Sequence, residues 1–239
     1  MHIPDGYLSP ETYLPLYGVF IVTTAVAVKK AERQLDLKTI PWLGMVSAFS
    51  FLIMMFNIPI PGGTTGHAIG GAAITLLLGP WIGSIAITTA LVIQAFIFGD
   101  GGITALGANC LNMGYILCFS SWFIYKLLAR SESSEKRKNM AAFFSGYIGV
   151  NLAALATATE LGLQPLIAVS SSGVPLYCPY PLSVTLPAMM IEHLCFFGVA
   201  EGLITVFVFR YVRHHHPELI RTHLDGIKAT TTIARKNNK

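Results

Sequence analysis

The chain has 239 residues, of which 53% are hydrophobic and only 12% charged, and its mean hydropathy is +0.60. These values are typical of a polytopic membrane protein and argue against a soluble enzyme or a nucleic-acid-binding protein. The formal net charge of +4 comes from 16 Lys and Arg against 12 Asp and Glu. No GxxxxGK[ST] phosphate loop and no GxGxxG turn is found, so any ATP hydrolysis must occur in another chain.

The first residues, MHIPDGYLSPE, contain no Lys or Arg and do not resemble a cleavable signal peptide, so we expect the mature chain to start at Met1. The Met1 amine, the His2 amide nitrogen and His2 Nδ1 can then close two chelate rings around one metal ion. Ionising an amide is costly, and the ions best suited to a planar nitrogen set are Ni(II) and Cu(II). A fourth ligand must come from elsewhere.

Apolar runs along the chain predict membrane-spanning helices, because most approach the ~20 residues that a ~30 Å hydrocarbon core requires. They cover residues 12–28, 42–58, 67–78, 80–98, 103–128, 140–161 and 186–212. The segment 67–98 is either one span or two short spans, and Pro80 favours a break after Gly79 because proline suits the first turn of a new helix.

The basic residues decide between these alternatives. All 16 Lys and Arg lie within 29–38, 126–138 and 210–239. The positive-inside rule places the three clusters in the cytoplasm, so an even number of spans must separate the first two clusters. We therefore expect an all-α bundle of seven transmembrane spans with the N-terminus outside and the C-terminus cytoplasmic.

This topology defines the expected domain organisation. Residues 1–213 form one transmembrane metal-binding domain, whose segment 1–11 carries metal ligands, and residues 214–239 form a basic, disordered cytoplasmic tail. Small residues at Ala27 and Ala31 suggest a place where a partner helix packs closely.

His67 is the candidate for the fourth ligand. It lies in GGTTGHAIGG, whose glycines at 62, 63, 66, 70 and 71 let another backbone approach. We expect the preceding loop, 59–66, to be irregular and to line a polar cavity with His67 at its base. Ten extended residues reach roughly 33 Å, so the N-terminal segment can meet His67 there. The alternative is that His2 is solvated and His67 is a hydrogen-bonded interior histidine.

Other polar residues allow two interpretations. Asp5 either accepts hydrogen bonds near the metal or is solvated in a turn. Asn109 and Asn112 are assigned to interhelical hydrogen bonds rather than to metal contact. Intramembrane ionisable groups mark function by default, but paired structural groups are an equal alternative, and the side chains concerned are Glu160, Glu192, His193 and Glu201.

Three further features are given no direct role in metal capture. The loop 162–185, rich in Pro, Gly and Ser, is expected to be a flexible external cap. The run His214–His216 is read as a solvated segment, with a cytoplasmic release site as the alternative. The four cysteines lack CxxC spacing and predict neither disulfides nor an iron-sulfur site.

MHIPDGYLSP followed by PGGTTGHAIGG resembles the CbiM/NikM family, the substrate-binding membrane subunits (S components) of energy-coupling-factor nickel and cobalt transporters. The resemblance runs from Met1 to about Arg213. It implies that the metal is held by the Met1 amine, the His2 amide and imidazole, and His67. It also implies a multi-pass protein of the cell membrane, working with a transmembrane coupling subunit, a pair of cytoplasmic ATPases and a small accessory membrane subunit. The continuation IPDG favours Ni(II), with Co(II) as the alternative.

Two functions are therefore compared. The first is a component of an ATP-driven uptake system that binds Ni(II), or Co(II), outside and delivers it to the cytoplasm. The second is an intramembrane metal-dependent enzyme or metal sensor. A catalytic metal keeps an open coordination position, whereas four planar nitrogens leave only weak axial positions. The predicted ligand set thus favours transport over catalysis.

Overall fold

The computed structural model describes residues 1–32, 34, 40–60, 64–129, 133–220 and 222. Its helices are α1 (Pro10–Glu32), α2 (Ile40–Met54), α3 (Gly71–Leu78), α4 (Pro80–Ile93), α5 (Leu106–Asn109), α6 (Leu117–Leu128), α7 (Glu135–Gly162), α8 (Gln164–Ile167), α9 (Leu182–Glu192) and α10 (Gly198–His215). Strands β1 (Ile58–Ile60) and β2 (Thr64–Gly66) form a hairpin. Three π-helical turns, η1 (Gln94–Phe98), η2 (Cys110–Ile116) and η3 (His193–Phe197), and the 3-10 turn η4 (Pro217–Leu219) complete the fold.

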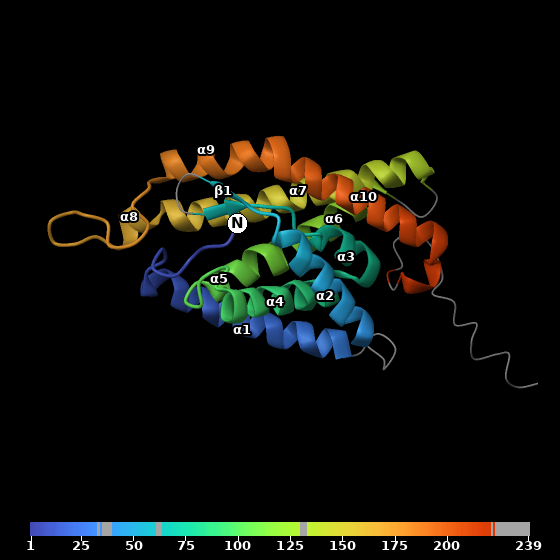
Figure 1. The fold of residues 1–239 in the computed structure, drawn as a ribbon, viewed down its shortest axis with the longest axis horizontal. Helices are drawn as coiled ribbons and strands as arrows, with labels where there is room; N and C mark the ends of the chain where they lie inside the picture. The colour runs from blue at the N-terminus through green and yellow to red at the C-terminus, as the bar shows by residue number, and fades with distance from the viewer. Residues whose placement is uncertain (33, 35–39, 61–63, 130–132, 221, 223–239) are drawn as a thin grey trace, which may run out of the picture.

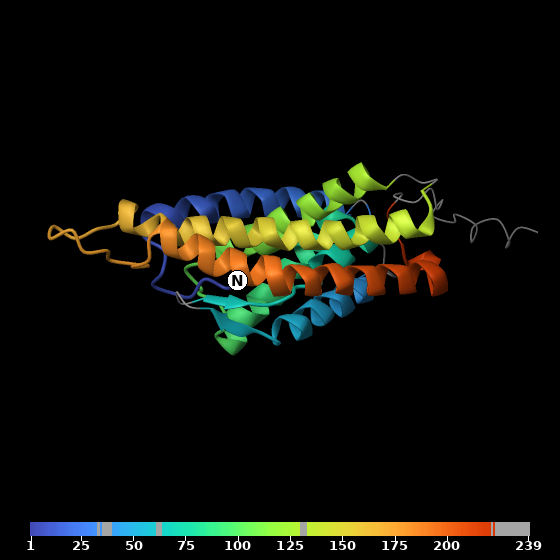
Figure 2. The same ribbon diagram turned by 90° about the horizontal axis from the view of Figure 1, so that it is seen from above.

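The long helices lie along the longest axis of the molecule, with α7 packed against both α6 and α10 (Figure 1). The short helix α3 lies inside the bundle, and all eight of its residues are buried. The chain begins near the middle of the molecule rather than at one end, beside the β1–β2 hairpin (Figures 1 and 2). The N-terminal segment therefore enters the bundle.

The prediction of an all-helical membrane protein is confirmed in its coarse form. Among the described residues, four helices are long and apolar enough to cross a membrane: Pro10–Glu32, Pro80–Phe98, Glu135–Ile167 and Leu182–His215. Helix α2 is apolar but shorter. The seven-span topology and the orientation of the termini stay predictions.

The break at Gly79-Pro80 is present as predicted. Helix α3 ends at Leu78, Gly79 adopts a positive φ of 91°, and α4 begins at Pro80. Because an L-residue with a side chain rarely adopts this φ, glycine makes the sharp turn possible here. Residues 67–98 are thus divided into the short helix α3 and the helical segment Pro80–Phe98, which is long enough to cross a membrane.

The segment between α2 and α3 differs from the prediction. Helix α2 ends at Met54 rather than at residue 58, and the segment expected to be irregular is an antiparallel hairpin in which Ile58 pairs with Gly66. A helix is disfavoured before Pro59 because the proline ring clashes with the preceding residue. Backbone polar groups that would be exposed in a loop are instead paired across the hairpin, although Gly62 and Gly63 lie outside the described residues.

Ala27 and Ala31 do not form an open surface for a partner helix. Ala27 is packed with Leu111 and Tyr115, and Ala31 belongs to the main apolar core. Both are almost fully buried, at 0% and 1% exposure, within this chain alone. The small residues of α1 therefore allow close packing inside the bundle, and the expected partner position was wrong.

The chain continues in regular structure beyond residue 213, where we placed the domain boundary. Helix α10 ends at His215, and Thr222 Oγ1 donates a hydrogen bond of 2.7 Å to the Leu76 carbonyl at the end of α3. Residues 223–239 of the expected tail, and Arg33, Lys38 and Arg130 of the basic clusters, lie outside the described residues.

Candidate metal centre

The N-terminal segment is held on one side by strand β2. The Met1 amine donates to the Thr65 carbonyl and lies 3.3 Å from Thr65 Oγ1, and Thr64 Oγ1 donates to the His2 carbonyl at 3.0 Å. Met1 is fully buried, and His2 is only 4% exposed. The hairpin thus fixes the amine of Met1 and the backbone of His2.

The other side of the N-terminal segment is held by Asn109 and the loop before α5. Ile3 N donates to Asn109 Oδ1 at 2.9 Å, and Asn109 Nδ2 donates to the Ile3 carbonyl at 3.1 Å. Gly102 N also donates to the Ile3 carbonyl at 2.8 Å. A Cβ at Gly102 would overlap the backbone of Asp5, so glycine is required for this approach. The backbone around His2 is therefore clamped between two segments.

The outer part of the N-terminal segment contacts residues 162–185, which the sequence predicts to be a flexible external cap without a direct role in metal capture. Gln164 Oε1 accepts from Ser9 N at 2.9 Å, and Cys178 N donates to the Tyr7 carbonyl at 3.1 Å. Asp5 is exposed and accepts from the backbone nitrogens of Ile103 and Thr104 at 3.1 and 2.7 Å. Asp5 is therefore a hydrogen-bonded anchor at the surface.

The structure brings His2 and His67 together. Their rings stack with centroids 4.7 Å apart and an interplanar angle of 29°. His67 is fully buried, with Nδ1 3.1 Å from the Ala68 carbonyl. When Nδ1 carries the proton and donates it there, Nε2 is left with an electron pair, and Nε2 has no hydrogen-bond partner among the described residues. This is the arrangement that a metal ligand requires.

His2 faces Asp100. Its Nδ1 lies 2.9 Å from Asp100 Oδ1, although neither ring nitrogen makes a well-aligned hydrogen bond within the described part of the chain. The chelate predicted from the sequence uses Nδ1 together with the amine and the His2 amide. For Nδ1 to join that set, the imidazole has to turn away from Asp100.

The chain start is surrounded by several other buried polar atoms. These atoms also have no hydrogen-bond partner among the described residues. They include both amide atoms of Gln94, Asp100 Oδ2, Glu192 Oε2 and His193 Nε2. The Met1 amine is within electrostatic range of Asp100 and Glu192, and His67 is within range of His193. Buried polar groups are normally paired, so such a group of unpaired atoms suggests a site for a polar ligand or ion.

Burial also sets the protonation of the N-terminal groups. It lowers the pKa of the Met1 amine from 8.0 to about 4, against the opposing charges of Asp100 and Glu192. The pKa of His2 is lowered as well, chiefly by burial, with Asp100 acting in the opposite direction. Both groups are therefore neutral near pH 7, and their electron pairs are available to a cation.

Side chains alone do not complete a metal site here. Among the described residues, no group of three or more His, Cys, Asp or Glu side chains is placed to hold a metal ion. His2 and His67 supply two imidazoles. The mixed ligand set of Met1, His2 and His67 stays a prediction.

Glu160 and His214 have partners outside the proposed ligand set. Glu160 accepts a 2.7 Å hydrogen bond from Asn112 Nδ2, which fits the interhelical bonding predicted for Asn112. His214 Nε2 lies 3.5 Å from Glu135 Oε2 where α10 ends and α7 begins. By contrast Asn109, assigned to interhelical bonding, binds the N-terminal backbone. Its position in an apolar run was the available signal, but the sequence could not show its partner.

Comparison with known proteins identifies the family. Residues 2–219 match the family model CbiM, described as the cobalt uptake substrate-specific transmembrane region. The fused nickel transport protein NikMN of Rhodobacter capsulatus is 46% identical over 92% of this chain and 64% of its own length. The probable fused nickel transport protein LarMN of Lactiplantibacillus plantarum is 46% identical over 91% of this chain and 66% of its own length. This chain thus spans less than two thirds of each of these relatives.

A cobalt transport protein, CbiM of Geobacter sulfurreducens, is 30% identical over 92% of this chain and 61% of its own length. A solved structure titled as a truncated transition metal transporter shares 50% sequence identity and a TM-score of 0.87, covering 90% of this chain and all of the other. The relatives named here are described as transport proteins, two of them for nickel and one for cobalt. The match over residues 2–219 and these relatives show that this chain belongs to the CbiM/NikM family of membrane components.

Proposed function

We propose that this chain is the substrate-specific membrane component of an ATP-driven uptake system and that it carries Ni(II). Its ligands are the Met1 amine, the His2 amide nitrogen and imidazole, and the His67 imidazole, arranged as a square plane of nitrogens. The observation that carries the proposal is the stacking of His2 on His67 at 4.7 Å beside the buried chain start.

The chemistry of the ligands favours this proposal. The Met1 amine and both imidazoles lie inside the bundle, where their neutral forms are the stable ones, so a cation can bind their electron pairs without first displacing a proton. Among the proposed ligands, only the His2 amide nitrogen must still release a proton when the metal binds. Ni(II) assists this step because its d electrons favour tetragonal nitrogen fields.

Nickel is preferred over cobalt as the cargo for two reasons. The square-planar nitrogen set suits Ni(II) better than Co(II). Moreover, the relatives named for nickel transport are 46% identical to this chain, whereas the Geobacter sulfurreducens cobalt protein is 30% identical. Co(II) is the alternative cargo.

The proposed setting follows from the resemblance and the charge pattern. The chain crosses the cell membrane seven times, with the metal-ligating segment outside and a basic tail, 214–239, in the cytoplasm. A transmembrane coupling subunit, a cytoplasmic ATPase pair and a small accessory membrane subunit supply the energy and the conformational change. Support for partners comes from the nickel relatives, which are fused proteins longer than this chain.

The test is the metal content and spectrum of the protein purified from cells supplied with nickel and cobalt together. Nickel in about one equivalent per chain, with the absorption of a diamagnetic, yellow, square-planar complex, is the expected result. A preparation holding mainly cobalt would reverse the choice of cargo. A six-coordinate aquo-nickel spectrum would refute the four-nitrogen site while leaving metal transport intact.

A further inference from the structure

One carboxylate inside the bundle binds the backbone that follows His67. Glu201 of α10 is fully buried, and its Oε2 accepts from Ile69 N at 2.7 Å and from Gly70 N at 2.8 Å. Its Oε1 accepts from Ala72 N at 3.2 Å. These nitrogens lie at the start of α3, where no intrahelical acceptor exists for them. A carboxylate at this end of a helix is also favoured by the helix dipole.

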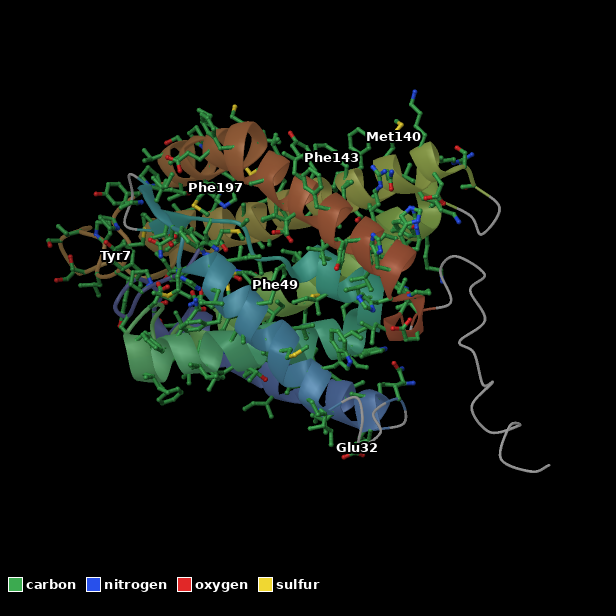
Figure 3. All side chains as sticks on the ribbon, turned by 45° about the vertical axis from the view of Figure 1, so that its right-hand side comes forward. Tyr7, Glu32, Phe49, Met140, Phe143 and Phe197 are labelled. Carbon is green, nitrogen blue, oxygen red and sulfur yellow. The ribbon has the colours of Figure 1, made fainter. Side chains whose placement is uncertain are left out.

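The same helical face contacts the residue before His67. Phe197 lies one turn before Glu201 in the last long helix, and its ring covers Gly66 so closely that a Cβ there would overlap it. In Figure 3, Phe197 is labelled where this helix passes the hairpin. Residues on both sides of His67 are thus held by one helix.

Glu201 itself is held in place by close helix packing. A Cβ at Gly146 would lie 2.9 Å from the Glu201 carbonyl oxygen, and a Cβ at Gly202 would lie 2.8 Å from the Phe143 ring. Helices α7 and α10 therefore approach at these glycines, and the carboxylate has little freedom to move. The position of His67 is in this way connected to the last helix of the bundle.

From these contacts we infer that Glu201 is a positioning residue for His67, holding the segment 66–72 so that the His67 imidazole meets the N-terminal ligands. This inference rests on the proposed function, because it assumes that His67 binds the metal. Glu201 does not itself touch the metal. It acts through the backbone of Ile69, Gly70 and Ala72.

The primary test is Glu201→Gln. The amide keeps the size of the carboxylate but places an N–H donor where an oxygen accepts, so at least one backbone nitrogen loses its partner. Nickel affinity should fall by about 10–100-fold, as it does when a residue that orients a metal ligand is replaced. The square-planar absorption should shift as well. Glu160→Gln is the matched control, because Glu160 is another helical carboxylate but is bonded to Asn112, and it should bind nickel as the unaltered protein does.

A double variant separates positioning from general damage. If Glu201 acts through His67, then Glu201→Gln combined with His67→Ala should bind nickel no more weakly than His67→Ala alone. Independent losses that multiply would overturn the inference, as would normal affinity in Glu201→Gln. If His67→Ala itself binds nickel normally, the proposed site is wrong. An affinity loss in Glu201→Gln would then need another cause.

A second route avoids replacing a buried carboxylate. Gly66→Ala should push the Phe197 ring aside and weaken nickel binding, and adding Phe197→Leu should restore part of the affinity by making room for the new methyl group. Gly44→Ala is the matched control, because nothing lies within 4 Å of a Cβ there. Gly66→Ala with unchanged affinity and spectrum would show that this helix does not set the position of His67.

Discussion

The imidazoles of His2 and His67, from the chain start and from the connection before α3, stack at 4.7 Å inside the bundle. Each ring is fixed by a different part of the protein. The backbone of His2 is held by Thr64 and lies next to Ile3, which is bonded to Asn109, whereas His67 precedes the turn that Glu201 binds. The contact between them therefore depends on the whole fold being assembled.

Removing the His67 imidazole should abolish tight nickel binding. His67→Ala takes away one of the proposed ligands, and the loss should exceed the ~100-fold upper range found for residues that only support ligands. His2→Ala should be as severe. Calorimetric titration with Ni(II) measures the effect, and His214→Ala, at the end of α10, is the matched control that should change nothing. Nickel affinity unchanged in His67→Ala would place the fourth ligand elsewhere.

One extra residue before Met1 should stop uptake. Met1 is fully buried, and its amine donates to Thr65, so an added residue has to displace this contact. In addition, the extended chain places the imidazole third, and its amine, two amides and imidazole can fill a square plane without His67. Such a protein can still hold Ni(II) in its N-terminal segment, but no longer between that segment and His67.

The measurements are nickel uptake by cells that make the extended protein with its partner subunits, and nickel binding by that protein with and without His67→Ala. A residue added after Lys239 is the control and should leave uptake unchanged. Normal uptake by the N-terminally extended form would mean that the amine is not a ligand.

Asn109→Ala should weaken nickel binding without removing a ligand. The side chain makes two hydrogen bonds to the backbone of Ile3, so its loss frees the segment that carries the Met1 amine and His2. A decrease of about 10–100-fold in affinity is expected. Asn112→Ala is the matched control, because Asn112 is buried in the same helical run but bonds to Thr157 and Glu160. Equal effects of the two changes would point to helix packing as the common cause.

Nickel affinity should rise steadily with pH. Burial lowers the pKa of the Met1 amine to about 4 and lowers that of His2 from its ordinary value, so both groups are mainly deprotonated at pH 7. The His2 amide proton is then the main proton released on binding. Each unit of pH should therefore raise the affinity about tenfold between about pH 6 and pH 8.

The slope of nickel affinity against pH tests both the ligation by the His2 amide and the neutral state of the Met1 amine. Affinity independent of pH over this interval would exclude amide ligation. A rise of about a hundredfold per unit would mean that a second group, such as the Met1 amine, still carries a proton in the folded protein. Competition with a metal chelator of known pH dependence provides the measurement.

Features that depend on local chemistry could be predicted from the sequence alone. The helical runs follow from apolar composition, and the division of residues 67–98 follows from Gly79 and Pro80, because glycine permits a positive φ and proline begins a helix. The candidate ligands Met1 and His2 follow from the donor atoms that these residues offer, whereas His67 was chosen over a structural histidine through the resemblance to the CbiM/NikM family.

Features that depend on contacts between distant segments were decided only by the tertiary structure. The glycines around His67 suggested the approach of another backbone, but at Gly66 and Gly70 the neighbours are the rings of Phe197 and Phe49. At Gly102, by contrast, the atoms that a Cβ would overlap include the backbone of Pro4 and Asp5. A glycine shows that space is needed, but which segment fills the space depends on how the helices pack.

The partners of buried polar groups also cannot be predicted from the sequence. The sequence marks Glu201 as unusual, because a carboxylate within an apolar helix is costly unless it is hydrogen-bonded. Its partners are backbone nitrogens more than a hundred residues away, at the start of α3. Backbone donors are the same at nearly every residue, so no sequence pattern identifies them as partners. Only the packing of α10 against α3 decides which nitrogens the carboxylate meets and therefore where His67 lies.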